Sequence, residues 1–176
     1  MAPPRPRVGI SACLLGQEVR WNGEHRREPW LVEVLGERVE WVPVCPEVEL
    51  GLGVPREPIR LVGDPGSPRL VAERSGRDHT SAMIRLAEER VGALAALGLA
   101  GYVTKRDSPS CGLAGVPVHP GGPPAPPAPA GTGLFVRVLR ARMPGLAVED
   151  EVRLRDPAVR EAFLARLFGP QPDPRG

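Results

Sequence analysis

Apolar residues along this chain form short continuous runs that alternate with segments of helical spacing. Three runs have the length and composition of buried strands, and they occupy residues 8–16, 39–44 and 101–104. Apolar residues at helical spacing, or helix start and stop signals, mark four further segments: residues 29–36, 78–98, 134–143 and 156–169. This alternation predicts an α/β fold, a single domain with a small, mostly parallel sheet flanked by helices.

The remaining segments carry weaker patterns. Residues 60–71, with Gly-Asp-Pro-Gly-Ser-Pro near their centre, are expected to form a hairpin or a loose loop. Residues 116–131 are rich in proline, glycine and alanine, and we expect a mobile loop that buries no core. Asp78 or Thr80 is expected to cap the second helical segment. The predicted domain therefore spans residues 8–148, between a flexible N-terminus at 1–7 and a C-terminal helix and tail at 149–176.

Each apolar run leads to a cysteine. Cys13 lies at the end of the first run, Cys45 directly follows the second, and Cys111 comes shortly after the third. Ligands of open parallel sheets bind beyond the carboxyl ends of the strands, so we expect the three thiols at one edge of the sheet. Soft thiolates select zinc, copper(I) or iron–sulfur clusters, and the lack of a Cys-x-x-Cys pair argues against a closed structural zinc site. A 4Fe-4S cluster on three cysteines would keep one iron open to substrate; three unrelated buried cysteines are the alternative.

Polar residues accompany these cysteines in the sequence. Glu47 stands two positions after Cys45 and suits a general base, while Ser108 suits a hydrogen-bond donor or a proton relay. Substrate-binding or charge-balancing roles are predicted for Lys105, Arg56, Arg20 and Ser110. Structural alternatives exist for these roles: Glu47 pairs with Arg56, Ser108 caps its Ser-Pro turn, and the arginines only stabilise loops.

Several stretches of the chain resemble one known family. They are Ser11-Ala12-Cys13-Leu14-Leu15-Gly16 with Val19-Arg20; Cys45-Pro46-Glu47 with Gly51-Leu52 and Pro55-Arg56; Asp78 with Thr80; and Lys105 with Ser108-Pro109-Ser110-Cys111-Gly112. In this order, from about Val8 to Arg142, they look like the TudS-type thiouracil desulfidases, a family formerly catalogued as a domain of unknown function. Trp21-Asn22-Gly23 stands where members commonly have Tyr-Asp-Gly, a departure that concerns substrate fit more than cluster binding.

This resemblance implies an α/β fold and a 4Fe-4S cluster on Cys13, Cys45 and Cys111. It also implies non-redox removal of sulfur from thiolated uracil, as thiouracil or thiouridine, with Glu47 and Ser108 beside the substrate. We therefore expect a hydrolytic desulfidase. A non-catalytic iron–sulfur or metal-binding sensor is the first alternative, and a metal-free enzyme with one nucleophilic cysteine is the second.

Composition sets limits on these interpretations. Charged residues make up 25% and apolar residues 41% of the 176 positions, as in ordinary globular proteins. A net charge of only +2 favours a small thiolated pyrimidine over thiolated RNA as the substrate. The sequence contains no apolar run of membrane-spanning length and no apolar signal segment near its start, so we expect no membrane association and a cytoplasmic location. The odd number of cysteines, three, argues against a disulfide framework.

Overall fold

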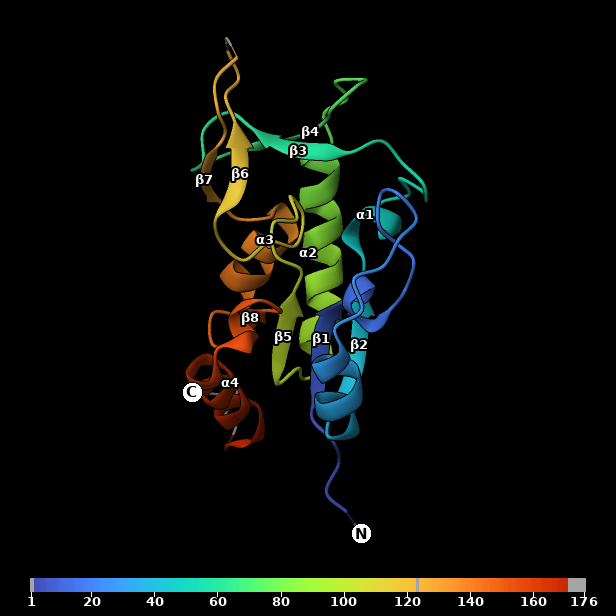
Figure 1. Cartoon of the computed structure of the whole chain (residues 1–176), viewed down its shortest axis with the longest axis vertical. Coiled ribbons are helices and arrows are strands. Elements are labelled where there is room, and N and C mark those ends of the chain that lie inside the picture. The colour runs from blue at the N-terminus through green and yellow to red at the C-terminus, as the bar shows by residue number, and fades with distance from the viewer. Residues whose placement is uncertain (1, 123, 171–176) are drawn as a thin grey trace.

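The main sheet of the protein is parallel throughout and has the strand order β2-β1-β5-β8 (Figure 1). The structure is a computed structural model, and it describes residues 2–122 and 124–170. The strands are β1 (Arg7–Ser11), β2 (Glu40–Val44), β5 (Gly101–Thr104) and β8 (Ala147–Asp150). The predicted α/β fold is confirmed, and the three predicted strands are consecutive neighbours in the sheet. The fourth strand, β8, is absent from the sequence-based prediction.

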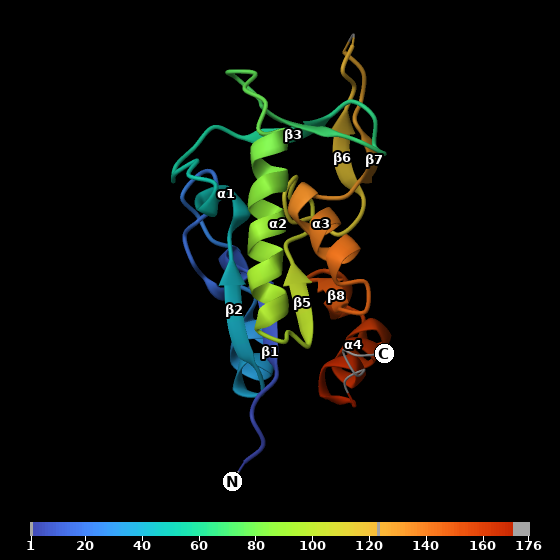
Figure 2. The ribbon, with the colours of Figure 1, turned by 180° about the vertical axis from the view of Figure 1, so that it is seen from behind.

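Helices and irregular turns cover both faces of this sheet. On one face lie α2 (Thr80–Ala96) and α3 (Leu134–Arg142), which are in front of the sheet in Figure 2. Tyr102 of β5 is fully buried on this face, and its ring lies so close to Gly9 of β1 that any side chain at Gly9 would collide with it. On the other face, Leu31 and Leu35 join residues of α4 (Pro157–Phe168) in a separate core.

The long helix α2 forms because its apolar residues recur at helical spacing. Its buried positions are Met83, Ala87, Val91 and Leu94. The N-cap of α2 is His79, not Asp78 or Thr80 as expected, and its side chain makes no capping hydrogen bond. Asp78 lies one position earlier and accepts a hydrogen bond from Thr80 N at 2.9 Å. Thr80 instead accepts a hydrogen bond from Leu70 N at 2.8 Å through its hydroxyl, so it ties the helix to the neighbouring strand.

A second sheet, with the order β4-β3-β6-β7, lies across the N-terminal end of α2 (Figure 1). Its strands are β3 (Ile59–Val62), β4 (Arg69–Ala72), β6 (Val116–His119) and β7 (Ala128–Gly131). The predicted hairpin within residues 60–71 is confirmed as the antiparallel β3–β4 pair. Leu61, Leu70 and Val116 of this sheet pack with Met83 of α2 in a third core.

The prediction that residues 116–131 form a loop that buries no core is wrong. Val116 and Val118 of β6 are 1% and 3% exposed. Pro117 lies opposite Pro129 in the β6–β7 ladder, and β7 is the outer strand of its sheet. Pro129 is tolerated at such an edge because the outer side of the strand makes no ladder hydrogen bonds, whereas Pro117 of the inner strand β6 lies at an irregularity in the register. The alternation of valine with other residues in β6, and not the overall composition, is the informative pattern here.

Shorter elements connect the strands. They are turns of 3-10 helix at Ala12–Leu15, Leu35–Glu37 and Arg153–Arg155, a π-helical turn at Trp30–Val34, and α1 at Pro46–Glu49. The helix predicted over residues 29–36 is therefore present only as two irregular turns. The predicted C-terminal helix is confirmed as α4, where Asp156 accepts a hydrogen bond from Ala158 N at 2.8 Å.

The ends of the chain differ slightly from their predicted bounds. Arg7 belongs to β1, where it pairs with Glu40, so the first strand begins one residue earlier than the predicted domain. The last part of the predicted tail, residues 171–176, lies outside the described residues, as does residue 1. Among the helices that are described, none combines the length and the hydrophobicity needed to span a bilayer.

Candidate functional site

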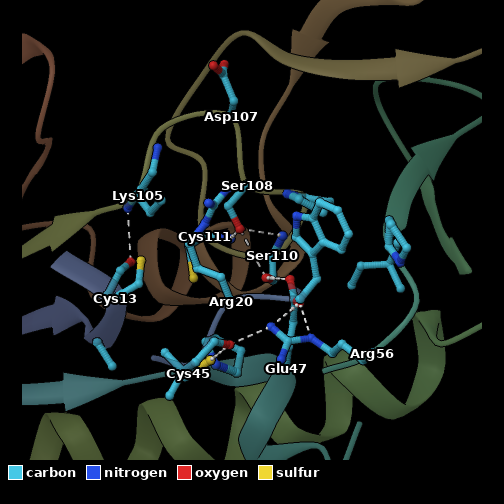
Figure 3. A pocket seen from close by; sticks show the side chains of 18 of the residues that line it. Cys13, Arg20, Cys45, Glu47, Arg56, Lys105, Asp107, Ser108, Ser110 and Cys111 are labelled. Carbon is cyan, nitrogen blue, oxygen red and sulfur yellow. Dashed lines mark hydrogen bonds and ion pairs between the residues drawn. The ribbon is translucent and has the colours of Figure 1, made fainter. Parts of the chain in front are cut away.

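Three cysteines follow three adjacent strands of the main sheet. Cys13 lies in the 3-10 turn after β1, Cys45 separates β2 from α1, and Cys111 lies in the loop after β5. All three are free thiols, and all three line a cavity of about 600 Å³ at the carboxyl edge of the sheet (Figure 3). The strand order β2-β1-β5 therefore brings together residues that are up to 98 positions apart in the sequence.

Burial dominates the electrostatics of these thiols. It raises the pKa of Cys13 to about 11, an effect that the ammonium of Lys105 partly opposes. It also raises the pKa of Cys45, against hydrogen bonds from the backbone at Val48 and Glu47. For Cys111, burial raises the pKa and a hydrogen bond from the Ser11 side chain acts in the opposite direction.

The three thiols also influence one another. Negative charge on Cys45 raises the pKa of Cys13, and charge on Cys13 and Cys45 raises the pKa of Cys111. Such mutual repulsion means that three thiolates are held together here only with positive charge between them. Within the described residues, however, no three His, Cys, Asp or Glu side chains converge closely enough to hold a single metal ion. A multinuclear cluster does not require that convergence, because each thiolate binds a different iron.

Glu47 reaches the same cavity from α1, which begins at Pro46 directly after Cys45. Its side chain is 12% exposed, and the Arg56 side chain beside it is 6% exposed. Arg56 Nε and Nη2 both lie 2.8 Å from Glu47 Oε2. Arg56 also donates to the carbonyl oxygens of Gly53 at 2.8 Å and Val19 at 2.9 Å. The predicted Glu47–Arg56 pairing is therefore present, and it fixes one carboxylate oxygen while the other remains for different partners.

Two serines connect the other oxygen of Glu47 with the loop of Cys111. Ser110 Oγ donates to Glu47 Oε1 at 2.7 Å, and Ser108 Oγ lies 3.2 Å from Ser110 Oγ (Figure 3). Ser108 Oγ also accepts hydrogen bonds from Ser110 N at 3.3 Å and from Cys111 N at 3.0 Å. Because a carboxylate paired with arginine only accepts, the Ser110 proton points to Glu47 and the Ser108 proton can point to Ser110. Ser108 therefore caps its turn, as the structural alternative predicted, and also belongs to a hydrogen-bonded chain that ends at Glu47.

Basic residues also line the cavity. Lys105 N donates to Ser11 Oγ at 3.0 Å, and Lys105 Nζ lies 2.8 Å from Glu151 Oε1. Arg20 Nη1 lies 3.6 Å from Glu24 Oε2 and is buried without a hydrogen-bond partner among the described residues. The cavity thus gathers every predicted site residue, whereas Glu151 is a neighbour that the sequence pattern did not indicate. Glu151 directly follows β8 at the same edge of the sheet, so a prediction that included this strand would have indicated the residue.

Three thiols, a carboxylate and two hydroxyls at one edge of a parallel sheet define an α/β protein with a thiol-lined cavity. The sequence profile of the 2-thiouracil desulfurase family matches residues 8–151, and the chain belongs to this family. The match begins at β1 and extends to Glu151, so it includes all three cysteines and the end of β8.

Two relatives extend this finding. YbbK of Bacillus subtilis strain 168, an uncharacterised protein, is 31% identical over 108 residues, which are 58% of this chain and 71% of YbbK. A solved structure, of a 4Fe-4S-dependent thiouracil desulfidase named TudS, is 34% identical with a TM-score of 0.69. That match covers 90% of this chain and 99% of the other. The predicted resemblance to TudS-type proteins is confirmed.

Proposed function

We propose that this protein is a 4Fe-4S-dependent desulfidase that removes sulfur from thiolated uracil by hydrolysis. Cys13, Cys45 and Cys111 would be the cluster ligands. The observation that carries the proposal is that three free thiols, each following one of three adjacent strands, share one cavity with Glu47 and Ser110. Membership of the 2-thiouracil desulfurase family and the likeness to TudS support the cofactor and the substrate class.

The donor set of the cavity suits such a cofactor. Among the described residues, three soft thiols and no histidine line it, which favours iron–sulfur chemistry over a hard cation. When bound, a 4Fe-4S cluster with three cysteine ligands supplies one iron without a protein ligand, a Lewis acid for the soft sulfur of a thiocarbonyl group. Lys105 and Arg20, which lower the pKa of Cys13, would offset the negative charge of the thiolates and sulfides.

Glu47 would act as the general base. Hydrolysis exchanges C=S for C=O: water provides the oxygen and the protons, sulfur leaves as sulfide, and neither an oxidant nor a reductant is needed. A base must take a proton from the water as its oxygen attacks the carbon. Arg56 holds Glu47 Oε2 and Ser110 donates to Oε1, so the orientation of this carboxylate in the cavity is fixed. The hydroxyls of Ser110 and Ser108 would accept this proton in turn or donate a hydrogen bond to the substrate.

The size of the cavity favours a small substrate. About 600 Å³ lies within the range of small-molecule sites and exceeds the room that a cluster alone needs. The weak net charge of the chain points in the same direction, because RNA binding usually relies on a strongly basic surface. We therefore expect a free thiolated pyrimidine or its nucleoside as the substrate.

The test begins with protein purified without oxygen. We expect about four irons with matching acid-labile sulfide per chain, and loss of both in Cys13→Ala, Cys45→Ala and Cys111→Ala. 2-Thiouracil turnover is then measured for wild type and Glu47→Gln. The variant should retain its iron and lose about 10²- to 10⁴-fold in kcat.

Glu49→Gln provides the matched control. Glu49 lies on the same short helix, pairs with Arg90 at 2.8 Å and is not part of the cavity lining, so its kcat should be unchanged. Protein that stays free of iron after anaerobic reconstitution would refute the cluster. Full iron content without turnover of 2-thiouracil, 4-thiouracil or their nucleosides would refute the desulfidase and favour the sensor.

A further inference from the structure

Lys105, the only lysine of the chain, is held at both of its ends. Its backbone N–H donates to Ser11 Oγ at 3.0 Å, which joins the end of β5 to the end of β1. Its ammonium lies 2.8 Å from Glu151 Oε1 and donates to the carbonyl oxygen of Arg106 at 2.9 Å. A lysine side chain is long and flexible, so an ammonium with two fixed partners is directed by them.

Glu151 is built into the structure as a clamp for this loop. Only 5% of the residue is exposed, an unusual burial for a carboxylate. Its two oxygens are divided between two partners: Oε1 takes Lys105 Nζ, and Oε2 accepts from Arg106 N at 2.8 Å. Its own N–H donates to the carbonyl oxygen of Thr104 at 3.3 Å. Three contacts thus connect the end of β8 with the last residue of β5 and the two residues that follow it.

This clamp, in which Glu151 binds Lys105 and Arg106, adjoins the cavity that Cys13 lines. Lys105 lines this cavity with Cys13, whose thiol senses the charges of both Lys105 and Glu151. Lys105 favours negative charge on that sulfur and Glu151 disfavours it, with Lys105 the stronger of the two. A buried carboxylate that repels negative charge on Cys13 would be unfavourable in this position unless it has another task.

We propose that Glu151 is a positioning residue, which holds the ammonium of Lys105 in a fixed place on the Cys13 side of the cavity. Without this carboxylate, the flexible side chain of Lys105 would turn toward solvent, and negative charge on Cys13 would lose a fixed cation. The inference rests on the proposed function, because it assigns Glu151 to the support of the same cluster site.

A double-mutant cycle on the anaerobically prepared holoprotein tests this proposal. The variants are Glu151→Gln, Lys105→Met and the double variant, and the readouts are kcat for 2-thiouracil and the rate at which an iron chelator removes the cluster. Glutamine can still accept the hydrogen bond from Arg106 N but carries no charge to hold the ammonium. The control is Glu149→Gln. Glu149 lies two residues before Glu151, and this substitution breaks its ion pair with Arg153, in which the charged atoms are 2.7 Å apart.

We expect Glu151→Gln to lower kcat by about 10-fold and to speed iron loss by a similar factor, as for other outer partners of metal ligands. In the Lys105→Met background the same substitution should change neither readout, because its effect passes through the ammonium. Glu149→Gln should behave like wild type. Unchanged kcat and iron loss in Glu151→Gln, or effects that simply add in the double variant, would overturn the proposal.

The wild-type protein separates this inference from the function on which it rests. Wild type without iron or turnover refutes the proposed function, whereas active wild type with an unaffected Glu151→Gln refutes only the role of Glu151. If Glu151→Gln does not fold, as a thermal melt would show, Glu151→Asp takes its place in the cycle. Aspartate keeps the charge but places it one methylene group farther from the ammonium of Lys105. We therefore expect Glu151→Asp, like Glu151→Gln, to have no further effect in the Lys105→Met background.

Discussion

The hydroxyl of Ser110 donates a 2.7 Å hydrogen bond to Glu47 Oε1, although the two residues are 63 positions apart in the sequence. Glu47 comes from the helical turn after β2, and Ser110 comes from the loop after β5. Since Arg56 holds Glu47 Oε2, the two oxygens of one carboxylate have separate partners. Ser110 therefore determines the surroundings of the only oxygen that Arg56 leaves available.

Ser110→Ala is predicted to impair turnover without loss of iron. The substitution removes the donor to Glu47 Oε1 and interrupts the chain that begins at Ser108. A lost hydrogen bond to a charged group corresponds to about 1.5–3 kcal/mol, so we expect kcat to fall by about 10- to 100-fold. Steady-state kinetics with 2-thiouracil, beside iron analysis, measures this effect. Ser81→Ala, on an exposed position of α2, should have no effect, and an equal loss in both variants would contradict the prediction.

Gly133→Ala is predicted to reduce iron binding although it changes no candidate ligand. A Cβ at this position would lie 2.7 Å from Cys111 N and would also collide with the backbone of Ser110. The loop must therefore move, and the Cys111 thiol moves with it, at a cost of about 1–3 kcal/mol in folding free energy. Iron per chain after anaerobic reconstitution is the measurement. Gly145→Ala is the matched control because a Cβ there meets nothing within 4 Å, and normal iron content in Gly133→Ala would contradict this account.

Arg56→Met is predicted to destabilise the metal-free protein by about 3–5 kcal/mol, because it leaves the Glu47 carboxylate buried without its partner. The double variant Arg56→Met/Glu47→Gln should recover part of that loss, since the charge disappears as well. Urea denaturation gives both values. The exposed pair of Arg7 with Glu40 provides the comparison, and Arg7→Met should change stability by no more than about 1 kcal/mol. Equal effects of Arg56→Met and Arg7→Met would show that burial of the first pair is unimportant.

Alkylation of Cys13 in the metal-free protein should require high pH. Only the thiolate reacts, and burial raises the pKa of Cys13 from 9.0 to about 11. The alkylation rate of the folded chain should thus rise with pH to a midpoint near 11, whereas the urea-unfolded chain should reach its midpoint about two pH units lower. Lys105→Met should move the folded midpoint upward, because the ammonium favours the thiolate. Peptide mapping by mass spectrometry assigns the rates, and coincident folded and unfolded midpoints would refute the prediction.

Much of the fold follows from local sequence, because strands and helices with strong apolar patterns were predicted in their observed order. The positions of Cys13, Cys45 and Cys111 after three such strands sufficed to place the thiols at one edge. The strand β8 was not predicted because its sequence, Ala-Val-Glu-Asp, has only two apolar residues. The strand also pairs with β5, a segment distant in the chain. Non-local backbone pairing of this kind leaves little trace in a four-residue pattern.

The site was predicted less completely than the fold. Sequence proximity indicated Glu47 and Arg56 as alternatives, a base or an ion pair, and the structure shows that one carboxylate both forms the ion pair and faces Ser110. The role of Glu151 depends on β8, so the residue could not be recognised until that strand was known. Which oxygen of a carboxylate meets which donor is a matter of tertiary geometry.

The three thiols lie beyond the ends of neighbouring strands whose separation, about 4.8 Å, is set by backbone hydrogen bonds. Apolar cores on both faces of the sheet hold those strands in place below the site. For the proposed cluster, such a scaffold would hold the three cysteines in place before iron arrives. A chain stripped of iron would then keep the arrangement of these residues, so repair would call for fresh iron and sulfide but neither refolding nor a newly made polypeptide.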